Sequence, residues 1–182
     1  MSSIGHSSCI VHHFVTMSST NQLRPPSPWP HRWAVVLVCA TFPLLWVGGL
    51  VTTTDAGMAV PDWPTTYGYN LFLYPWQARL AGAWGLFIEH GHRLLGALVR
   101  MLTIALAITL WRCDGRPWMK RTGAVAFALV VLQGVLGGLR VVLDERLLAM
   151  IHACTGPLFF ALVVALVVFT SARWLQGPAA HA

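Results

Sequence analysis

Four long apolar stretches dominate the chain, at roughly residues 33–51, 92–111, 122–142 and 147–169. Each is close to the ~20 residues that a helix needs to cross about 30 Å of hydrocarbon. They do not alternate between apolar and polar positions as the strands of a membrane barrel do, and an isolated strand cannot satisfy its backbone groups in lipid. We therefore predict an all-α, polytopic membrane protein in which residues 33–174 form a four-helix bundle.

The composition supports a lipid environment, since 56% of the 182 residues are hydrophobic and only 10% are charged. The formal net charge of +6 does not indicate nucleic acid, because the basic residues gather beside the ends of the apolar stretches. The four cysteines are scattered in a way that fits neither a metal site nor a disulfide framework. Membrane lipid, and no nucleic acid, is the expected partner.

Charge also predicts the orientation in the membrane. Seven basic residues and one acid lie before the first stretch, between the second and third, and after the fourth: Arg24, Arg32, Arg112, Arg116, Lys120, Arg121, Arg173 and Asp114. The positive-inside rule places such segments in the cytoplasm. We expect a multi-pass protein of a bacterial-type inner (plasma) membrane, with both termini cytoplasmic and residues 52–91 external.

The two ends of the chain are expected to be tails. Residues 1–32 are rich in Ser and Pro and lack the apolar core and cleavage site of a signal peptide, which favours a disordered cytoplasmic tail. Met17 is an alternative start. Residues 175–182 form a second cytoplasmic tail.

The segment 52–91 is the longest connection between apolar stretches, and connections of that length are usually functional or disordered. Its many aromatic residues and prolines favour an ordered lid over the bundle mouth. A segment lying in the lipid headgroups is the alternative.

Candidate chemistry lies beside this segment. Glu89 and His92 are three residues apart and share a helix face. His90 points away from His92, so only one of them can face the interior. His152 lies about one turn inside the other apolar stretch that begins at the external side. His92 and His152 are therefore expected at a similar depth on two different helices.

Two histidines at matched depth in a bundle are typical of haem ligation. Purely structural histidines and a different metal remain open, including a non-haem iron site of Glu89 and both histidines. An ionisable side chain within a membrane span is a functional candidate by default.

Several arginines and glycines surround these residues. Arg93, Arg140 and Arg146 at the external mouth suit haem propionates, although Asp144, Glu145 or lipid phosphates could pair with them. The spacing of Gly134 and Gly138 permits close helix packing or leaves room for a planar ligand. Arg100, deep in its stretch, costs at least ~2.5 kcal/mol there, and the sequence offers no account of it.

Four segments together, at residues 47–70, 89–96, 132–142 and 151–160, resemble the haem A synthase family. The resemblance spans residues 33–170 and implies oxidation of a methyl group of haem O to a formyl group, giving haem A for cytochrome oxidase. It maps Glu89, His92 and His152 onto the family's functional positions. We expect Glu89 to be catalytic and His92 and His152 to ligate the iron, with Arg93 and Arg140 assisting haem binding through their guanidinium groups. The ligand is then haem O as substrate or haem b, with its iron.

Departures from the family pattern are informative. Many members carry two cysteines in the first external loop, where this chain has Val60 and Thr65 or Thr66, so no redox-active disulfide is expected there. Many also have Arg where Thr52 stands. Most members have eight helices with a second histidine pair, so this chain resembles a half-length four-helix member.

That resemblance implies a homodimer, pairing with a second half-length subunit, or a chain that lacks the full activity. Two functions follow from the sequence: a haem A synthase-like oxidoreductase, or a non-enzymatic bis-His haem protein for electron transfer or oxidase assembly. Glu89 favours the enzyme, because a simple bis-His electron carrier needs no carboxylate one turn from a ligand.

Overall fold

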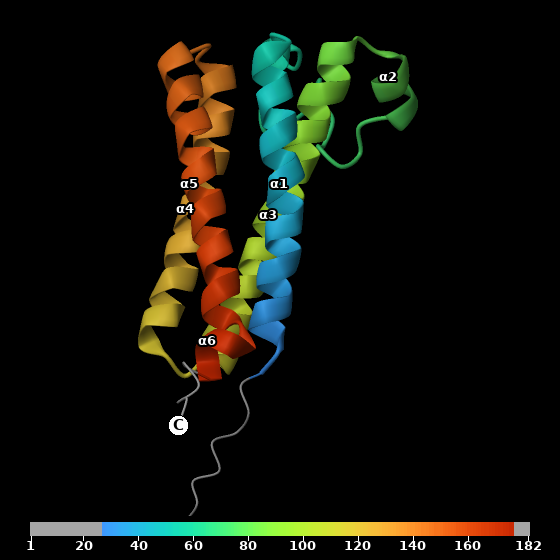
Figure 1. The fold of residues 1–182 in the computed structure, drawn as a ribbon. Coiled ribbons are helices and arrows are strands. Elements are labelled where there is room, and N and C mark those ends of the chain that lie inside the picture. The colour runs from blue at the N-terminus through green and yellow to red at the C-terminus, as the bar shows by residue number, and fades with distance from the viewer. Residues whose placement is uncertain (1–26, 177–182) are drawn as a thin grey trace, which may run out of the picture.

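The computed structural model describes residues 27–176. Residues 1–26 and 177–182 lie outside the described residues, and so do Met17 and most of both expected tails. Within the described part the chain is helical and forms an antiparallel four-helix bundle (Figure 1). The predicted all-α fold is confirmed.

Four helices form the bundle: α1 (Trp29–Thr53), α3 (Trp84–Cys113), α4 (Pro117–Val142) and α5 (Arg146–Thr170). Each is long and apolar enough to cross a membrane. The shortest have 25 residues, or about 38 Å at 1.5 Å per residue. Three short helices accompany them: η1 (Ala56–Met58), α2 (Trp76–Ala81) and α6 (Ala172–Gln176).

The helices begin earlier than their apolar stretches do. α1 and α4 each have a proline in the first turn, where the missing N–H costs nothing. α3 begins at Trp84 rather than near residue 92, because its first two turns pack against the preceding loop and carry the buried Glu89 and His90. The expected loop 52–91 is therefore shorter. We call residues 54–83 the lid.

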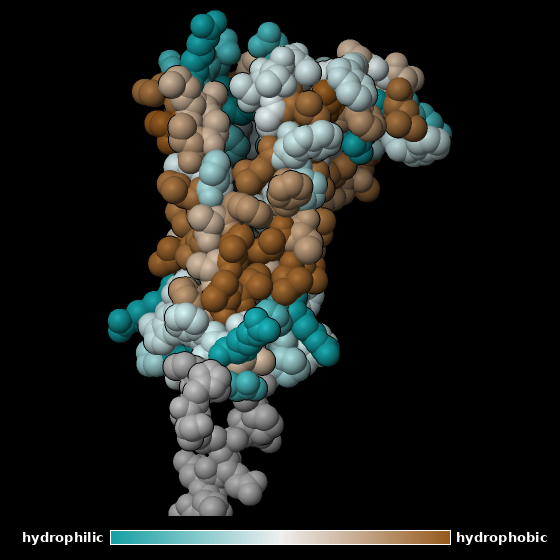
Figure 2. Space-filling view, viewed as in Figure 1, coloured by the Kyte–Doolittle hydropathy of each residue, from teal (hydrophilic) through white to brown (hydrophobic). Residues whose placement is uncertain are grey.

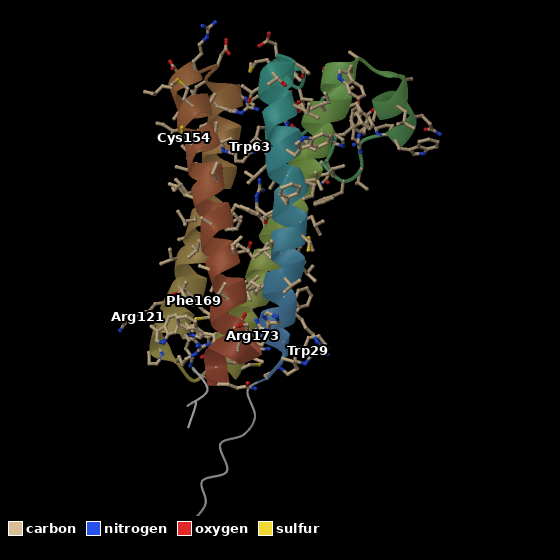
Figure 3. The ribbon with its side chains drawn as sticks, in the orientation of Figure 1. Trp29, Trp63, Arg121, Cys154, Phe169 and Arg173 are labelled. Carbon is tan, nitrogen blue, oxygen red and sulfur yellow. The ribbon has the colours of Figure 1, made fainter. Side chains whose placement is uncertain are left out.

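The two ends of the bundle differ. The first and last described residues lie at the same end of the bundle, the lower end in Figure 1, which we call the terminal end. The lid lies at the opposite end, which we call the loop end. Arg121, Arg173 and Trp29 all lie at the terminal end (Figure 3). A band of hydrophobic side chains girdles the visible face between hydrophilic ends (Figure 2). This distribution is that of a multi-pass membrane protein.

The large apolar core fills only part of the bundle, mainly its middle and terminal end. It includes Leu37, Val99, Leu106, Phe159 and Val163, all at most 3% exposed. At the loop end a smaller apolar cluster of Val51, Ala56 and Ile88 joins α1, η1 and α3. The interior between α1, α3, α4 and α5 at that end is lined by histidine, arginine and glycine instead, as described below.

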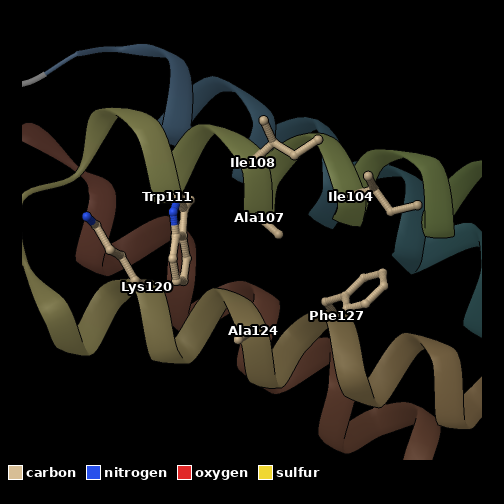
Figure 4. Close-up of a pocket in the computed structure, with 7 residues that line it drawn as sticks. All are labelled: Ile104, Ala107, Ile108, Trp111, Lys120, Ala124 and Phe127. Carbon is tan, nitrogen blue, oxygen red and sulfur yellow. The ribbon is translucent and has the colours of Figure 1, made fainter.

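A groove of about 310 Å³ lies between α3 and α4 toward the terminal end (Figure 4). Ala107 and Ala124 leave it hollow, and Trp111 and Lys120 close one end. The groove is otherwise apolar, and it lies away from the histidines.

Candidate functional site

The structure brings His92 and His152 together across the bundle. His92 lies on α3 and His152 on α5, their ring centroids are 6.4 Å apart, and the ring planes are nearly perpendicular at 86°. A metal–imidazole bond is about 2 Å long, so two such bonds and the two half-rings fit within this separation. The two helices place His92 and His152 at a similar depth in the bundle, as expected from the sequence.

Each histidine ring packs on a glycine of a neighbouring helix. A Cβ added at Gly48 of α1 would lie 3.0 Å from Cε1 of His92, and one at Gly137 of α4 would lie 3.2 Å from Cε1 of His152. A residue larger than glycine at position 48 or 137 would displace the histidine ring that packs there. The two glycines occupy matching positions in the short repeat Gly-Gly-Leu at residues 48–50 and 137–139.

The site contains polar atoms that lack partners. Nδ1 of His92, Nδ1 of His152 and Nε of Arg140 are buried without a hydrogen-bond partner, and Nε of Arg79 is the one other such side-chain atom in residues 27–176. A buried polar atom without a partner costs roughly 1–3 kcal/mol. Three of the four belong to the two histidines and Arg140, whose nitrogens a ligand with an iron and carboxylates would satisfy, so the residues fit a haem.

A metal bound by protein side chains alone fits less well. No group of three His, Cys, Asp or Glu side chains that could hold a metal ion occurs within the described ranges. Glu89 already binds other residues, as follows. The non-haem iron site that the sequence left open therefore has no support.

Glu89 is buried beneath the lid, with a relative exposure of 1%. Its Oε2 accepts a hydrogen bond from the backbone N–H of Val60 at 2.9 Å, and its Oε1 accepts one from Nη2 of Arg93 at 2.8 Å. The pair Glu89–Arg93 is also a salt bridge between residues one turn apart on α3. Both carboxylate oxygens thus bind groups that hold the lid to the bundle.

Arg93 is fully engaged with the lid. Besides Glu89, its guanidinium donates to the carbonyls of Val60, Asp62 and Thr65 at 2.6–3.0 Å. Arg140 differs, because it reaches from α4 to η1: its Nη1 lies 2.7 Å from where a Cβ of Gly57 would be, and its Nε is unpartnered. Arg140 is therefore the better placed of the two for a propionate.

His90 faces away from His92, as its spacing requires. Its Nδ1 lies 3.2 Å from the hydroxyl of the buried Thr66, and its ring lies 5.2 Å from that of Tyr74. Val60 and Thr66, near the positions where the family carries cysteines, are both completely buried. Here they contact Glu89 and His90 instead of forming a disulfide.

Asp62 organises the turn of the lid above Arg93. Its carboxylate accepts hydrogen bonds from the backbone of Tyr67 and Gly68 at 2.7 and 2.9 Å, and from the Thr65 hydroxyl. Burial by itself raises the pKa of Asp62, but these hydrogen bonds to the ionised form outweigh it and lower the pKa below its ordinary value. The turn is thus held by a carboxylate that stays charged at neutral pH.

Trp63 fixes the lid to α4. Its indole lies over Gly138 so closely that a Cβ there would overlap the ring, and Figure 3 shows Trp63 between the α4–α5 pair and α1. The spacing of Gly134 and Gly138 therefore does not serve a close helix contact at these points. It makes room for the side chains of Arg100 and Trp63.

We expect Gly138→Ala to detach the lid. The added methyl group displaces the Trp63 ring, at a cost of about 1–3 kcal/mol for overpacking. Limited proteolysis of the lid in detergent should be faster than in the parent protein. Gly49→Ala is the matched control, since nothing lies within 4 Å of a Cβ at Gly49. Equal cleavage rates for the two variants would show that Trp63 does not anchor the lid.

Sequence reasoning missed several of these contacts. The role of Val60 depends on its backbone N–H, which no sequence pattern reveals. Trp63 was expected only as one of many lid aromatics. A signal was present for Gly48 and Gly137, because the Gly-Gly-Leu repeat marks the two places on α1 and α4 against which the histidine rings pack.

The fold and the site together define a class: a four-helix membrane protein whose histidine pair faces across its loop end, under a lid held by a buried ion pair.

Comparison with known proteins identifies the family. The family model described as cytochrome oxidase assembly protein matches residues 31–180, and the chain belongs to this family. Heme A synthase of Shouchella clausii is 31% identical over 138 residues, which cover 74% of this chain and 44% of that protein. Heme A synthase of Brucella anthropi is 29% identical over 164 residues, covering 87% of this chain and 44% of that protein.

The chain therefore spans less than half the length of the curated relatives it matches. No solved structure matches it.

Proposed function

We propose that this chain is a haem A synthase-type membrane oxidoreductase that oxidises a methyl group of haem O to a formyl group. The observation that carries the proposal is the facing pair His92 and His152, each on a glycine and each with an unpartnered Nδ1. The names of the relatives and the family match support the same activity. Haem, when bound, supplies the iron and the methyl group that is oxidised.

The residues of the chain have distinct roles in this proposal. His92 and His152 would ligate the iron and hold the macrocycle between α3 and α5. Arg140 pairs with a propionate. Arg93 contributes by holding the lid over the site. Oxidation of the methyl group to a formyl group takes one oxygen atom from water and releases four protons and four electrons, and the electrons leave to an acceptor outside this bundle.

Glu89 is the proposed catalytic residue. It lies one turn outside His92 toward the loop end, where a carboxylate can take a proton or stabilise positive charge at the porphyrin edge. For this role one carboxylate oxygen must exchange its bond to Arg93 or Val60 for the substrate. The positive charge of Arg93, which forms a salt bridge with Glu89, dominates the electrostatic potential at the carboxylate when the bond is exchanged.

A second function is favoured by one observation. Because both oxygens of Glu89 are engaged by Arg93 and Val60, the carboxylate already has a complete structural role. A bis-His haem protein for electron transfer or oxidase assembly would need no more than this. The two functions differ in whether haem A is formed.

We further propose that the four-helix unit acts beside a second unit, either another copy or a second half-length subunit. The relatives are more than twice as long as the matched region, which supports this pairing. Analytical ultracentrifugation of the purified chain in detergent, across a range of concentrations, should show a dimer.

The proposed orientation places the terminal end in the cytoplasm of a bacterial-type inner membrane. Seven basic residues against one acid favour it. In intact cells a membrane-impermeant maleimide should label Asn70→Cys in the lid and leave the natural, exposed Cys113 at the terminal end unlabelled. Lysed cells are the control for Cys113. Labelling of Cys113 from outside, with Asn70→Cys protected, would reverse the orientation.

Turnover tests the proposed activity directly. Membranes containing the chain and supplied with haem O should form haem A, measured by chromatography and mass. Haem O that is bound but never converted, under conditions in which a full-length relative converts it, would favour the non-enzymatic function.

A further inference from the structure

Arg100 is a charged residue near the middle of a membrane-spanning helix, α3. Its side chain is half-buried, and it makes no hydrogen bond or salt bridge with any residue in the described range 27–176. A charge at such a depth costs about 2.5–3.5 kcal/mol on insertion scales and normally has a named partner. The partner is missing from the part of this chain that the structure describes.

The guanidinium of Arg100 lies against α4 just below the histidines. Its Cζ, Nε and Nη2 are 3.1–3.2 Å from the position that a Cβ of Gly134 would occupy. Gly134 precedes Gly137 by three residues, about one helical turn, and Gly137 is the glycine on which His152 packs. A residue larger than glycine at position 134 would push the guanidinium away.

The direction of the side chain follows from helix geometry. Side chains lean toward the N-terminus of their helix, and the N-terminus of α3 lies at the loop end. Arg100 therefore leans toward His92 and away from the apolar core. Its guanidinium forms the floor of the histidine site. Val99 of α3, next to Arg100, and Val130 of α4, one turn from Gly134, belong to the apolar core.

The charges around the site leave this arginine uncompensated. The carboxylate of Glu89 is taken by Arg93. Arg140 at the mouth retains an unpartnered Nε, and Arg100 at the floor forms no salt bridge within residues 27–176. Two guanidinium groups thus bracket the histidine pair along the bundle axis, and a guanidinium prefers an oxygen acceptor such as a carboxylate.

We propose that Arg100 binds an oxygen acceptor on the edge of the haem that lies deepest in the bundle, so that Arg140 and Arg100 hold opposite edges of the macrocycle. This rests on the proposed binding of haem by His92 and His152. Both propionates share the edge of the ring that Arg140 holds, so the acceptor at Arg100 is an oxygen of another ring substituent. Arg100 thereby fixes how the ring is turned about the axis through the two histidines.

The test uses the full-length purified protein and three probes: haem b, its dimethyl ester, and haem A. Haem b carries oxygen only in its propionates, the ester removes their charge, and haem A adds a formyl oxygen and the hydroxyl oxygen of its farnesyl-bearing side chain. Binding is measured for the parent, Arg100→Gln and Arg100→Lys. Arg121→Gln is the matched control, since Arg121 is exposed at the terminal end.

Arg100→Gln should weaken binding of an acceptor-bearing haem about tenfold to hundredfold, as expected for a lost hydrogen bond to a charged donor. The haem midpoint potential should fall, because a positive charge near the iron disfavours the ferric state. Arg100→Lys should recover part of both, and Arg121→Gln should change neither. A loss confined to haem A identifies the formyl or the side-chain hydroxyl oxygen as the acceptor; a loss seen with haem b but not with its ester would place a propionate at Arg100 and overturn the assignment of the two edges.

Gly134→Ala provides a second route if Arg100→Gln does not fold. It keeps the charge but moves the guanidinium, so affinity and potential should shift in the same directions by a smaller amount. The Arg100 variants could instead leave affinity and potential unchanged for all three probes, while His92→Ala still abolishes haem binding. That result would overturn the role of Arg100 and leave the proposed function standing. A parent protein that binds none of the probes would overturn the proposed function itself.

Discussion

Replacing His152 with alanine is expected to abolish the six-coordinate, low-spin haem spectrum of the protein and to weaken haem binding by about a hundredfold or more. Even partners in the outer shell of a metal are worth about 10–100-fold in affinity, and His152 is a proposed direct ligand. Its ring faces His92 at 6.4 Å, and the other two histidines of residues 27–176, His31 and His90, contact Thr170 and Thr66 instead. Absorption spectra of haem-titrated protein provide the measurement, and His92→Ala should behave in the same way.

His90→Ala is the matched control for these variants. His90 is also buried and lies two residues from His92, but it contacts Thr66 and Tyr74 of the lid. Its loss should loosen the lid while the low-spin spectrum persists. If His90→Ala lost the spectrum and His152→Ala kept it, the ligand assignment would be wrong.

Glu89→Gln is expected to keep bound haem and to lose haem A formation. The amide keeps the shape of the side chain and can still accept the Val60 N–H, but it removes the charge that Arg93 pairs with. Breaking a buried ion pair costs about 3–5 kcal/mol, so thermal stability should fall as well. Haem content, haem A yield and melting temperature are measured on the same preparation.

The control for Glu89 is Glu145→Gln, an exposed acid at the loop end. It should change none of the three quantities. Full activity of Glu89→Gln would exclude a catalytic carboxylate and leave Glu89 as a structural residue of the lid. Loss of haem together with activity would place Glu89 in the binding site instead.

The fold was predictable from sequence because lipid allows few solutions. Four apolar stretches near 20 residues long can cross a bilayer only as helices. The depth of His92 and His152 followed from their distance to the helix ends. Helix beginnings were less predictable, since α3 starts with two turns whose polar residues are buried by the lid rather than by lipid.

The partners of the charged residues could not be predicted. Arg93 was expected at haem propionates with Arg140, but the structure engages it in four hydrogen bonds to the lid and Glu89. Three of those acceptors are backbone carbonyls, whose positions depend on the folded lid. The sequence also gave no reason for Arg100, because its position opposite Gly134 depends on the packing of α3 against α4.

The central claim is that one haem lies between His92 and His152, and the haem content of the purified protein tests it most directly. Pyridine haemochrome and mass analysis, with the absorption spectrum of the same sample, give the type and amount of haem and its spin state. We expect one low-spin haem O or haem A per chain. A protein purified from haem O-producing cells that holds no haem, and takes up none on titration, would contradict it.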